Sequence, residues 1–127
     1  MRRDPSVDVI AWTASQPVRT MHISIGTLAE IDFGIARLEA GARKARFETW
    51  RDELVRQFGS RILPADVKVA STWGNVRARG VAAGKTMPLM YALLAATAEV
   101  HGLTIVTRNV KDFEVWGGPV FNPWTDV

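Results

Sequence analysis

Oxygen-bearing side chains follow a short apolar run in the last quarter of the chain. The run Leu103–Thr107 (LTIVT) is rich in β-branched residues and has the length of a strand. Asn109 and Asp112 come shortly after it. In an open α/β sheet, ligands bind at the loops beyond the carboxyl ends of the strands. We therefore take Asp112 and Asn109 as the first candidates for metal or catalytic chemistry.

Glu30 is a third candidate, and each of the three also has a purely structural interpretation. The sequence Thr27-Leu28-Ala29-Glu30 fits a capping box, in which the Glu30 carboxylate returns to the N-cap amide. The alternative is a metal ligand that projects from the start of a helix, and the pattern favours the cap. Asp112 could likewise start a short helix, and Asn109 could be a turn residue.

Two further motifs do not support a site. The segment Arg79–Thr86 contains GVAAGKT, which resembles a phosphate-binding P-loop. That motif needs four residues between its glycines and a preceding strand, whereas here three residues separate them after a helix. We interpret the segment as a loop between helices and discard an unrelated nucleotide-binding domain. Neither His22 nor His101 has a partner at the spacing of metal ligands, which favours structural roles.

Helices alternate with short strands along the whole chain, which predicts one layered α/β domain over residues 1–127 with a parallel sheet. The expected helices run from Asp4-Pro5 to before Pro17, from Thr27 to Ala40-Gly41, from Ala42 to Phe58, from Asp66 to before Arg79, and from Pro88 to Gly102. The expected strands are Met21–Ile25, Ile62–Leu63, Leu103–Thr107 and the edge strand Pro119–Phe121.

Hydrophobic periodicity indicates which helix faces are buried. The helix that ends at Gly102 is apolar nearly all round, so it should lie in the core. The helix Ala42–Phe58 carries a stripe that predicts a core face, while its five basic residues form a solvated face. The stripe consists of Phe47, Trp50, Leu54 and Phe58.

The amino-acid composition is that of an ordinary globular protein with a net positive charge. The 127 residues are 47% hydrophobic and include no cysteine, which excludes disulfides and thiolate metal sites. No apolar run reaches the roughly 18 residues of a membrane span, so a cytoplasmic protein is expected. The net charge of +3 is compatible with an anionic partner such as nucleic acid, or with a role in solubility alone.

Five segments, taken in order, resemble the PIN domains of the VapC family, the toxin half of bacterial toxin–antitoxin pairs. The resemblance covers nearly the whole chain. Its segments are Thr27–Ile31, Ile62–Pro64 with Asp66, Leu94–Ala98 with His101–Leu103, Thr107–Asn109 with Asp112-Phe113, and Asn122–Trp124.

The resemblance implies a three-layer α/β/α fold and an endoribonuclease that depends on Mg²⁺ or Mn²⁺. In the family, four acidic residues hold the cation through oxygen ligands and activate a water for attack on RNA. Glu30 and Asp112 would be two of these catalytic, metal-binding residues, and Thr107 and Asn109 would support them by hydrogen bonds. A cognate antitoxin and a second copy of the chain are the implied partners.

The chain departs from the family pattern at two places. The family opens with an aspartate-bearing strand, and this sequence starts just after it, so the first strand of the sheet is expected to be missing. Tyr91 stands where the family has an aspartate, and a phenol cannot supply a carboxylate's charge. The alternative function is therefore a non-catalytic, degenerate toxin that binds an antitoxin or its own copy. We further expect Glu30 and Asp112 to approach each other, with Tyr91 facing the same pocket.

Overall fold

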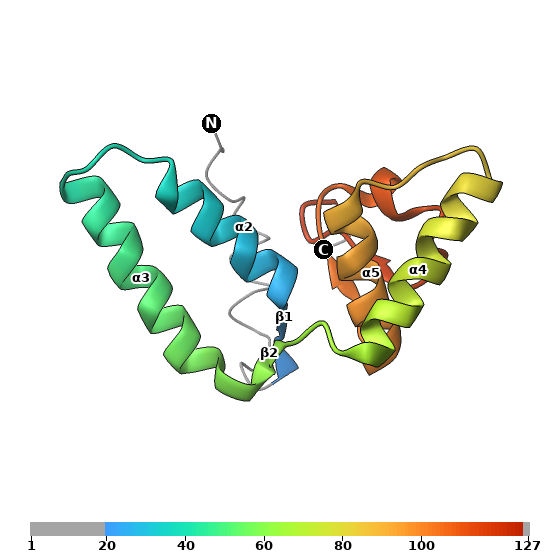
Figure 1. Ribbon diagram of the computed structural model, residues 1–127, viewed down its shortest axis with the longest axis horizontal. Coiled ribbons are helices and arrows are strands. Elements are labelled where there is room, and N and C mark those ends of the chain that lie inside the picture. Colours follow the sequence, from blue (N-terminus) through green and yellow to red (C-terminus); the bar gives the residue numbers. More distant parts are fainter. Residues whose placement is uncertain (1–19, 126–127) are drawn as a thin grey trace. The chain divides into compact units, whose positions relative to one another are not determined.

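The computed structural model describes residues 20–125, which divide into two compact units (Figure 1). The hairpin unit comprises residues 22–64, and the core unit comprises residues 65–125 together with Thr20 and Met21. The helix predicted to start at Asp4-Pro5 lies outside the described residues. That all 127 residues form one domain stays a prediction, and each unit is described by itself.

The hairpin unit is two helices flanked by two short, paired strands (Figure 1). The strand β1 (Ile23–Ser24) pairs in parallel with β2 (Ile62–Leu63), so that Ile23 lies opposite Ile62. Between them run α2 (Ile25–Ala36), α3 (Ala42–Phe58) and the 3-10 helix η2 (Gly59–Arg61). The parallel pairing and the strand Ile62–Leu63 are confirmed, while β1 is shorter than the predicted strand.

The start of α2 contradicts the predicted capping box. The Ser24 hydroxyl accepts a hydrogen bond from the Thr27 amide at 3.0 Å and caps the helix, which begins at Ile25 rather than Thr27. Thr27 lies inside the first turn, and its own hydroxyl lies 3.1 Å from that of Ser24. Glu30 is therefore not an N3 residue, and the cap interpretation of its carboxylate is wrong. The helix also ends at Ala36, earlier than predicted.

Helix α3 has the predicted bounds but not the predicted burial. None of its residues is buried, and the Phe47 and Trp50 side chains are 40% and 48% exposed. The two rings meet edge to face, with 6.4 Å between their centroids. The other two residues of the stripe, Leu54 and Phe58, are half-buried, so the prediction that this face lies in the core is wrong.

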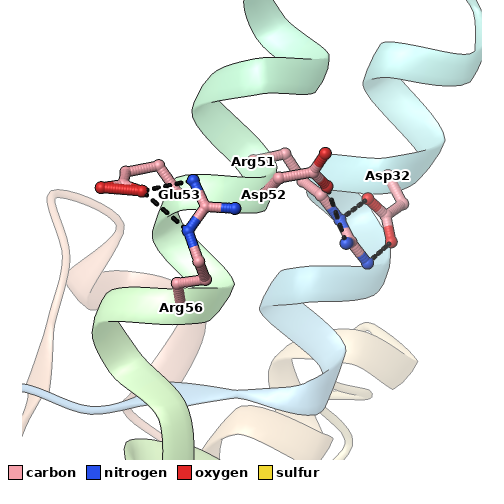
Figure 2. A network of polar contacts seen from close by, with 5 residues as sticks. All are labelled: Asp32, Arg51, Asp52, Glu53 and Arg56. Carbon is pink, nitrogen blue, oxygen red and sulfur yellow. Dashed lines mark hydrogen bonds and ion pairs between the residues drawn. The ribbon is translucent and has the colours of Figure 1, made fainter.

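Polar contacts connect α3 to α2 (Figure 2). The Arg51 guanidinium makes a two-pronged contact with the Asp32 carboxylate, at 2.8 Å from Nε and 3.1 Å from an Nη atom. A further ion pair joins Arg51 to Asp52 at 3.3 Å. The hydrogen bond to Asp32 raises the pKa of Arg51 above its ordinary value. Since that value already lies far above neutrality, Arg51 stays charged at neutral pH.

The core unit contains two helices that pack against each other (Figure 1) and a second pair of short strands. Its elements are α4 (Val67–Ala82), α5 (Leu89–His101), β3 (Ile105–Val106), the 3-10 helix η3 (Val110–Phe113) and β4 (Val120–Phe121). The strands β3 and β4 are parallel, with Ile105 opposite Val120. The largest buried cluster gathers residues from all of these elements except β4: Val76, Met87, Ala92, Ala95, Ala98, Ile105, Phe113 and Trp116.

Helix α4 begins as predicted and ends later. The Asp66 carboxylate accepts the Val69 amide at 2.9 Å, which confirms the expected N-cap. The predicted loop from Arg79 is wrong, because the helix continues to Ala82. Gly80 is buried there, and a Cβ built on it would lie 2.8 Å from the Lys85 carbonyl oxygen. This glycine therefore serves a close backbone approach rather than a break in the helix.

Helix α5 is the buried element that the sequence predicted. Ala92, Leu93 and the run Ala95–Ala98 are buried, although Leu89 at its start is 53% exposed. Gly102 ends it in the left-handed conformation with φ +64°, as expected, and the Leu103 amide donates to the Ala98 carbonyl at 2.9 Å. This turn feeds β3 directly. No helix among the described residues is long and apolar enough to cross a membrane.

Candidate functional site

The loop after β3 is folded by its own polar groups. The Asn109 amide donates to the Thr107 hydroxyl at 3.0 Å, and the Asp112 amide donates to the Asn109 carbonyl at 3.1 Å. These bonds form the turn that leads into η3, with Asp112 in its first turn. The Asp112 carboxylate is exposed and makes no hydrogen bond or ion pair with any residue of the described range 20–125. Its oxygens are therefore available to a ligand.

Tyr91 reaches this loop from α5. Its hydroxyl accepts a hydrogen bond from the Asn109 side-chain amide at 3.3 Å. Its ring stacks on that of Phe113, with centroids 5.2 Å apart and planes at 27°. Phe113 is 2% exposed, so this stack fixes the half-buried Tyr91 ring against the core while its phenol lies beside Asn109. A neutral group therefore stands next to the loop that carries Asp112.

A network of three side chains anchors the segment beyond η3. One Glu99 carboxylate oxygen accepts from the Trp116 indole at 3.0 Å and from the Arg79 guanidinium at 3.1 Å. Arg79 also donates to the Trp116 carbonyl at 3.2 Å. The network connects α4 and α5 to the chain that follows Asp112. Sequence reasoning missed it, although Glu99 gave a signal as the only acidic residue of the largely buried α5.

A second contact joins the loop to the end of the described chain. The Arg108 guanidinium carbon lies 4.6 Å from the centroid of the Trp124 ring, within the range of a cation–π interaction. The backbone amide of Trp124 donates to the Asn122 side-chain oxygen at 2.8 Å, and Asn122 is 8% exposed. This contact was also missed by sequence reasoning, because residues 108 and 124 belong to separate motifs.

Glu30 lies on α2 in the hairpin unit, exposed and without a hydrogen bond or ion pair to any described residue. Asp112 belongs to the core unit, so the approach of these two carboxylates stays a prediction. Thr107, Asn109 and Tyr91, by contrast, are brought together with Asp112 in one loop region.

The loop offers oxygen ligands of the kind that a hard cation binds, but it carries little negative charge. Asp112, Asn109 and Thr107 offer the carboxylate, amide and hydroxyl oxygens that Mg²⁺ accepts. Only Asp112 among these is charged, and Tyr91 adds a neutral phenol. Within residues 20–125, no group of three or more His, Cys, Asp or Glu side chains is placed to hold a metal.

Comparison with known proteins identifies the family. No protein-family model matches the chain. The chain is 32% identical over 124 residues to the VapC ribonuclease Y4jK of Sinorhizobium fredii, covering 97% of this chain and 89% of the relative. It is 34% identical over 127 residues to toxin FitB of Neisseria gonorrhoeae, covering 99% and 91%. The crystal structure of FitAcB from Neisseria gonorrhoeae matches with a TM-score of 0.90 and 33% identity, over 98% of this chain and 90% of that one.

The chain belongs to the VapC family of PIN-domain toxins. The resemblance drawn from its sequence motifs is confirmed, and so is the predicted fold class, since the helices and short parallel strand pairs match VapC-family structures. Within this VapC-family chain, the loop after β3 is where Tyr91, Thr107, Asn109 and Asp112 lie together.

Proposed function

We propose that this VapC-family chain is a cytoplasmic toxin ribonuclease that hydrolyses phosphodiester bonds of RNA. The observation that carries the proposal is the exposed, unpaired Asp112 carboxylate in a loop folded by Thr107 and Asn109. Support also comes from relatives described as a VapC ribonuclease and as a tRNA(fMet)-specific endonuclease, both at least 31% identical to the chain.

We expect each candidate residue to have a role that follows from its functional group. Asp112 and Glu30 would hold Mg²⁺ or Mn²⁺ through carboxylate oxygens. When bound, such a cation supplies Lewis acidity and a nucleophilic water. Thr107 holds the turn by accepting the Asn109 backbone amide. Because the Asn109 side-chain nitrogen donates to Tyr91, its side-chain oxygen is left for the cation or for a water bound to it.

Tyr91 favours a second candidate function, a non-catalytic module that binds an antitoxin or a second copy of the chain. With a phenol beside Asn109, the loop provides one negative charge, and a cation that dehydrates as reluctantly as Mg²⁺ is held weakly by so little charge. The antitoxin is the partner we propose under both candidates, since solved relatives are toxin–antitoxin complexes such as VapBC-1 and FitAB. The exposed Phe33, Phe47 and Trp50 of the hairpin unit offer apolar surface to such a partner.

The test is cleavage of a structured RNA by the purified chain with Mg²⁺, with Mn²⁺ and with EDTA. We expect cleavage that requires the cation and falls about 100-fold or more in Asp112→Asn, since even supporting residues around metals contribute about 10–100-fold. Glu114→Gln, an exposed acid two positions further along, is the matched control and should retain activity.

Absence of cleavage with either cation would refute the ribonuclease and favour the binding module. Light scattering then separates the partners of that module: a mass of twice 14.0 kDa for the chain alone indicates pairing of two copies. Cleavage of equal rate in Asp112→Asn and the unsubstituted chain would remove Asp112 from the mechanism.

A further inference from the structure

Arg108 is held in place by an aromatic platform that is itself fixed. The residue follows Thr107 at the carboxyl end of β3, and its guanidinium carbon lies 4.6 Å from the Trp124 ring centroid. Trp124 comes shortly after β4, and the buried Asn122 accepts its backbone amide at 2.8 Å. The paired strands β3 and β4 thus present an arginine and its platform at the same end.

The charge of Arg108 is not neutralised within the described chain. Arg51, Arg56 and Arg79 each form an ion pair with a carboxylate, but Arg108 forms neither an ion pair nor a hydrogen bond with any residue from 20 to 125. A cation–π contact does not require its N–H groups as donors, so these remain available while the side chain is held. An exposed guanidinium that is held in position can donate two parallel hydrogen bonds to the oxygens of a phosphate.

We propose that Arg108, supported by Trp124, is a phosphate subsite that positions the RNA strand at the Asp112 loop. The proposal rests on the proposed ribonuclease function and adds a residue to it. Arg108 is adjacent to Asn109 in the chain and lies four positions before Asp112, so a phosphate bound there is beside the candidate site. Arg108 is a positioning residue, and Trp124 acts through it.

The experiment measures the affinity of a labelled single-stranded RNA over a series of salt concentrations, once with EDTA and once with Mg²⁺. Each phosphate contact contributes about 0.7 to the slope of log affinity against log salt for a single strand. Arg108→Gln should lower that slope by about 0.7 and weaken binding about tenfold at low salt. Arg77→Gln makes the same charge change at an exposed arginine of α4 and should alter neither.

Trp124→Leu separates the platform from the charge. The arginine remains, so the salt slope should be unchanged, while the affinity falls roughly threefold because the side chain is no longer held. Thermal melts of each variant establish that it is folded, and the exposed position of Arg108 makes Arg108→Gln compatible with the native fold.

The outcomes separate this subsite from the function on which it rests. Equal slopes and affinities for Arg108→Gln and Arg77→Gln would overturn the subsite alone. If the unsubstituted chain binds no RNA in either series, the proposed function fails and the subsite fails with it. A lower slope confined to Arg108→Gln supports both.

Discussion

Replacement of Glu99 by alanine tests how the site loop is supported. A single Glu99 oxygen accepts hydrogen bonds from the Trp116 indole at 3.0 Å and from Arg79 at 3.1 Å. Trp116 is 4% exposed, and it lies on the chain that leaves η3. Glu99→Ala removes the acceptor of a buried donor and leaves the packing of the tryptophan ring in place.

The expected loss of stability follows from these two contacts. A buried donor left without an acceptor costs about 1–3 kcal/mol. The Arg79–Glu99 pair is nearly half exposed at both side chains, so it adds about 0–1 kcal/mol. We therefore expect a decrease of about 2 kcal/mol in the free energy of unfolding. With an unfolding entropy of about 2.1 cal/mol/K per residue, this corresponds to a melting temperature lower by roughly 7 °C.

Urea denaturation and thermal melts provide the measurement, and two further variants control it. Glu99→Gln keeps a side-chain oxygen as acceptor and should lose less than half as much stability. In a Trp116→Phe background the donor no longer exists, so Glu99→Ala should cost about 1 kcal/mol less than in the unsubstituted chain. Equal costs of Glu99→Ala in the two backgrounds would refute the reasoning, because the carboxylate would then not act through the indole.

Three other substitutions test the fold and the site. Gly80→Ala places a methyl group against backbone and should destabilise α4 by about 1–3 kcal/mol in a urea titration, whereas Gly74→Ala, with open space around its Cβ, should be neutral or stabilising by up to about 1 kcal/mol. Trp50→Ser should change stability by less than about 0.5 kcal/mol, and a loss above 2 kcal/mol would show that α3 is covered after all. Tyr91→Asp should lower the melting temperature without metal and should regain more of it on addition of Mg²⁺ than the unsubstituted chain gains; a gain no larger than that of the unsubstituted chain would count against position 91 as a place for a metal ligand.

Local signals in the sequence predicted helix bounds well where a cap or a glycine defines them. Asp66 caps α4, Gly102 ends α5, and Gly41 and Gly59 flank α3 with positive φ angles. Each of these signals acts within a few residues, so it can be read from the chain alone. The start of α2 was misplaced because Ser24 and Thr27 are both good caps, and only the backbone decides between them.

Burial and long-range contacts were harder to predict. The stripe on α3 shows that the helix is amphipathic, but periodicity does not indicate which surface covers the apolar face, and Phe47 and Trp50 proved exposed. Gly80 was assigned to a loop because a glycine often interrupts a helix. Its actual role, a close approach to the Lys85 backbone, depends on the path of the chain after α4, which the sequence does not indicate.

The surroundings of the candidate residues could be predicted only in outline, and their role as a site stays a prediction. The loop after β3 could be found because the carboxyl ends of parallel strands are where side chains converge, and the structure does gather Thr107, Asn109 and Tyr91 there. The network around Glu99 and the contact between Arg108 and Trp124 join residues 16 or more positions apart. Such contacts depend on tertiary packing, for which this single sequence carries no local pattern.

The absence of buried residues along α3 has a consequence for how the protein opens. Most of the stability of a helix in a protein comes from the packing of one face, and α3 has little packing among the described residues. Its backbone amides should therefore exchange with solvent through local opening of the α2–α3 hairpin. The amides of α5, enclosed by the largest buried cluster, should exchange only when the core unit unfolds as a whole. We therefore expect amide exchange to report α3 and α5 as parts of different cooperative units, with exchange of the α3 amides at conditions under which the α5 amides stay protected.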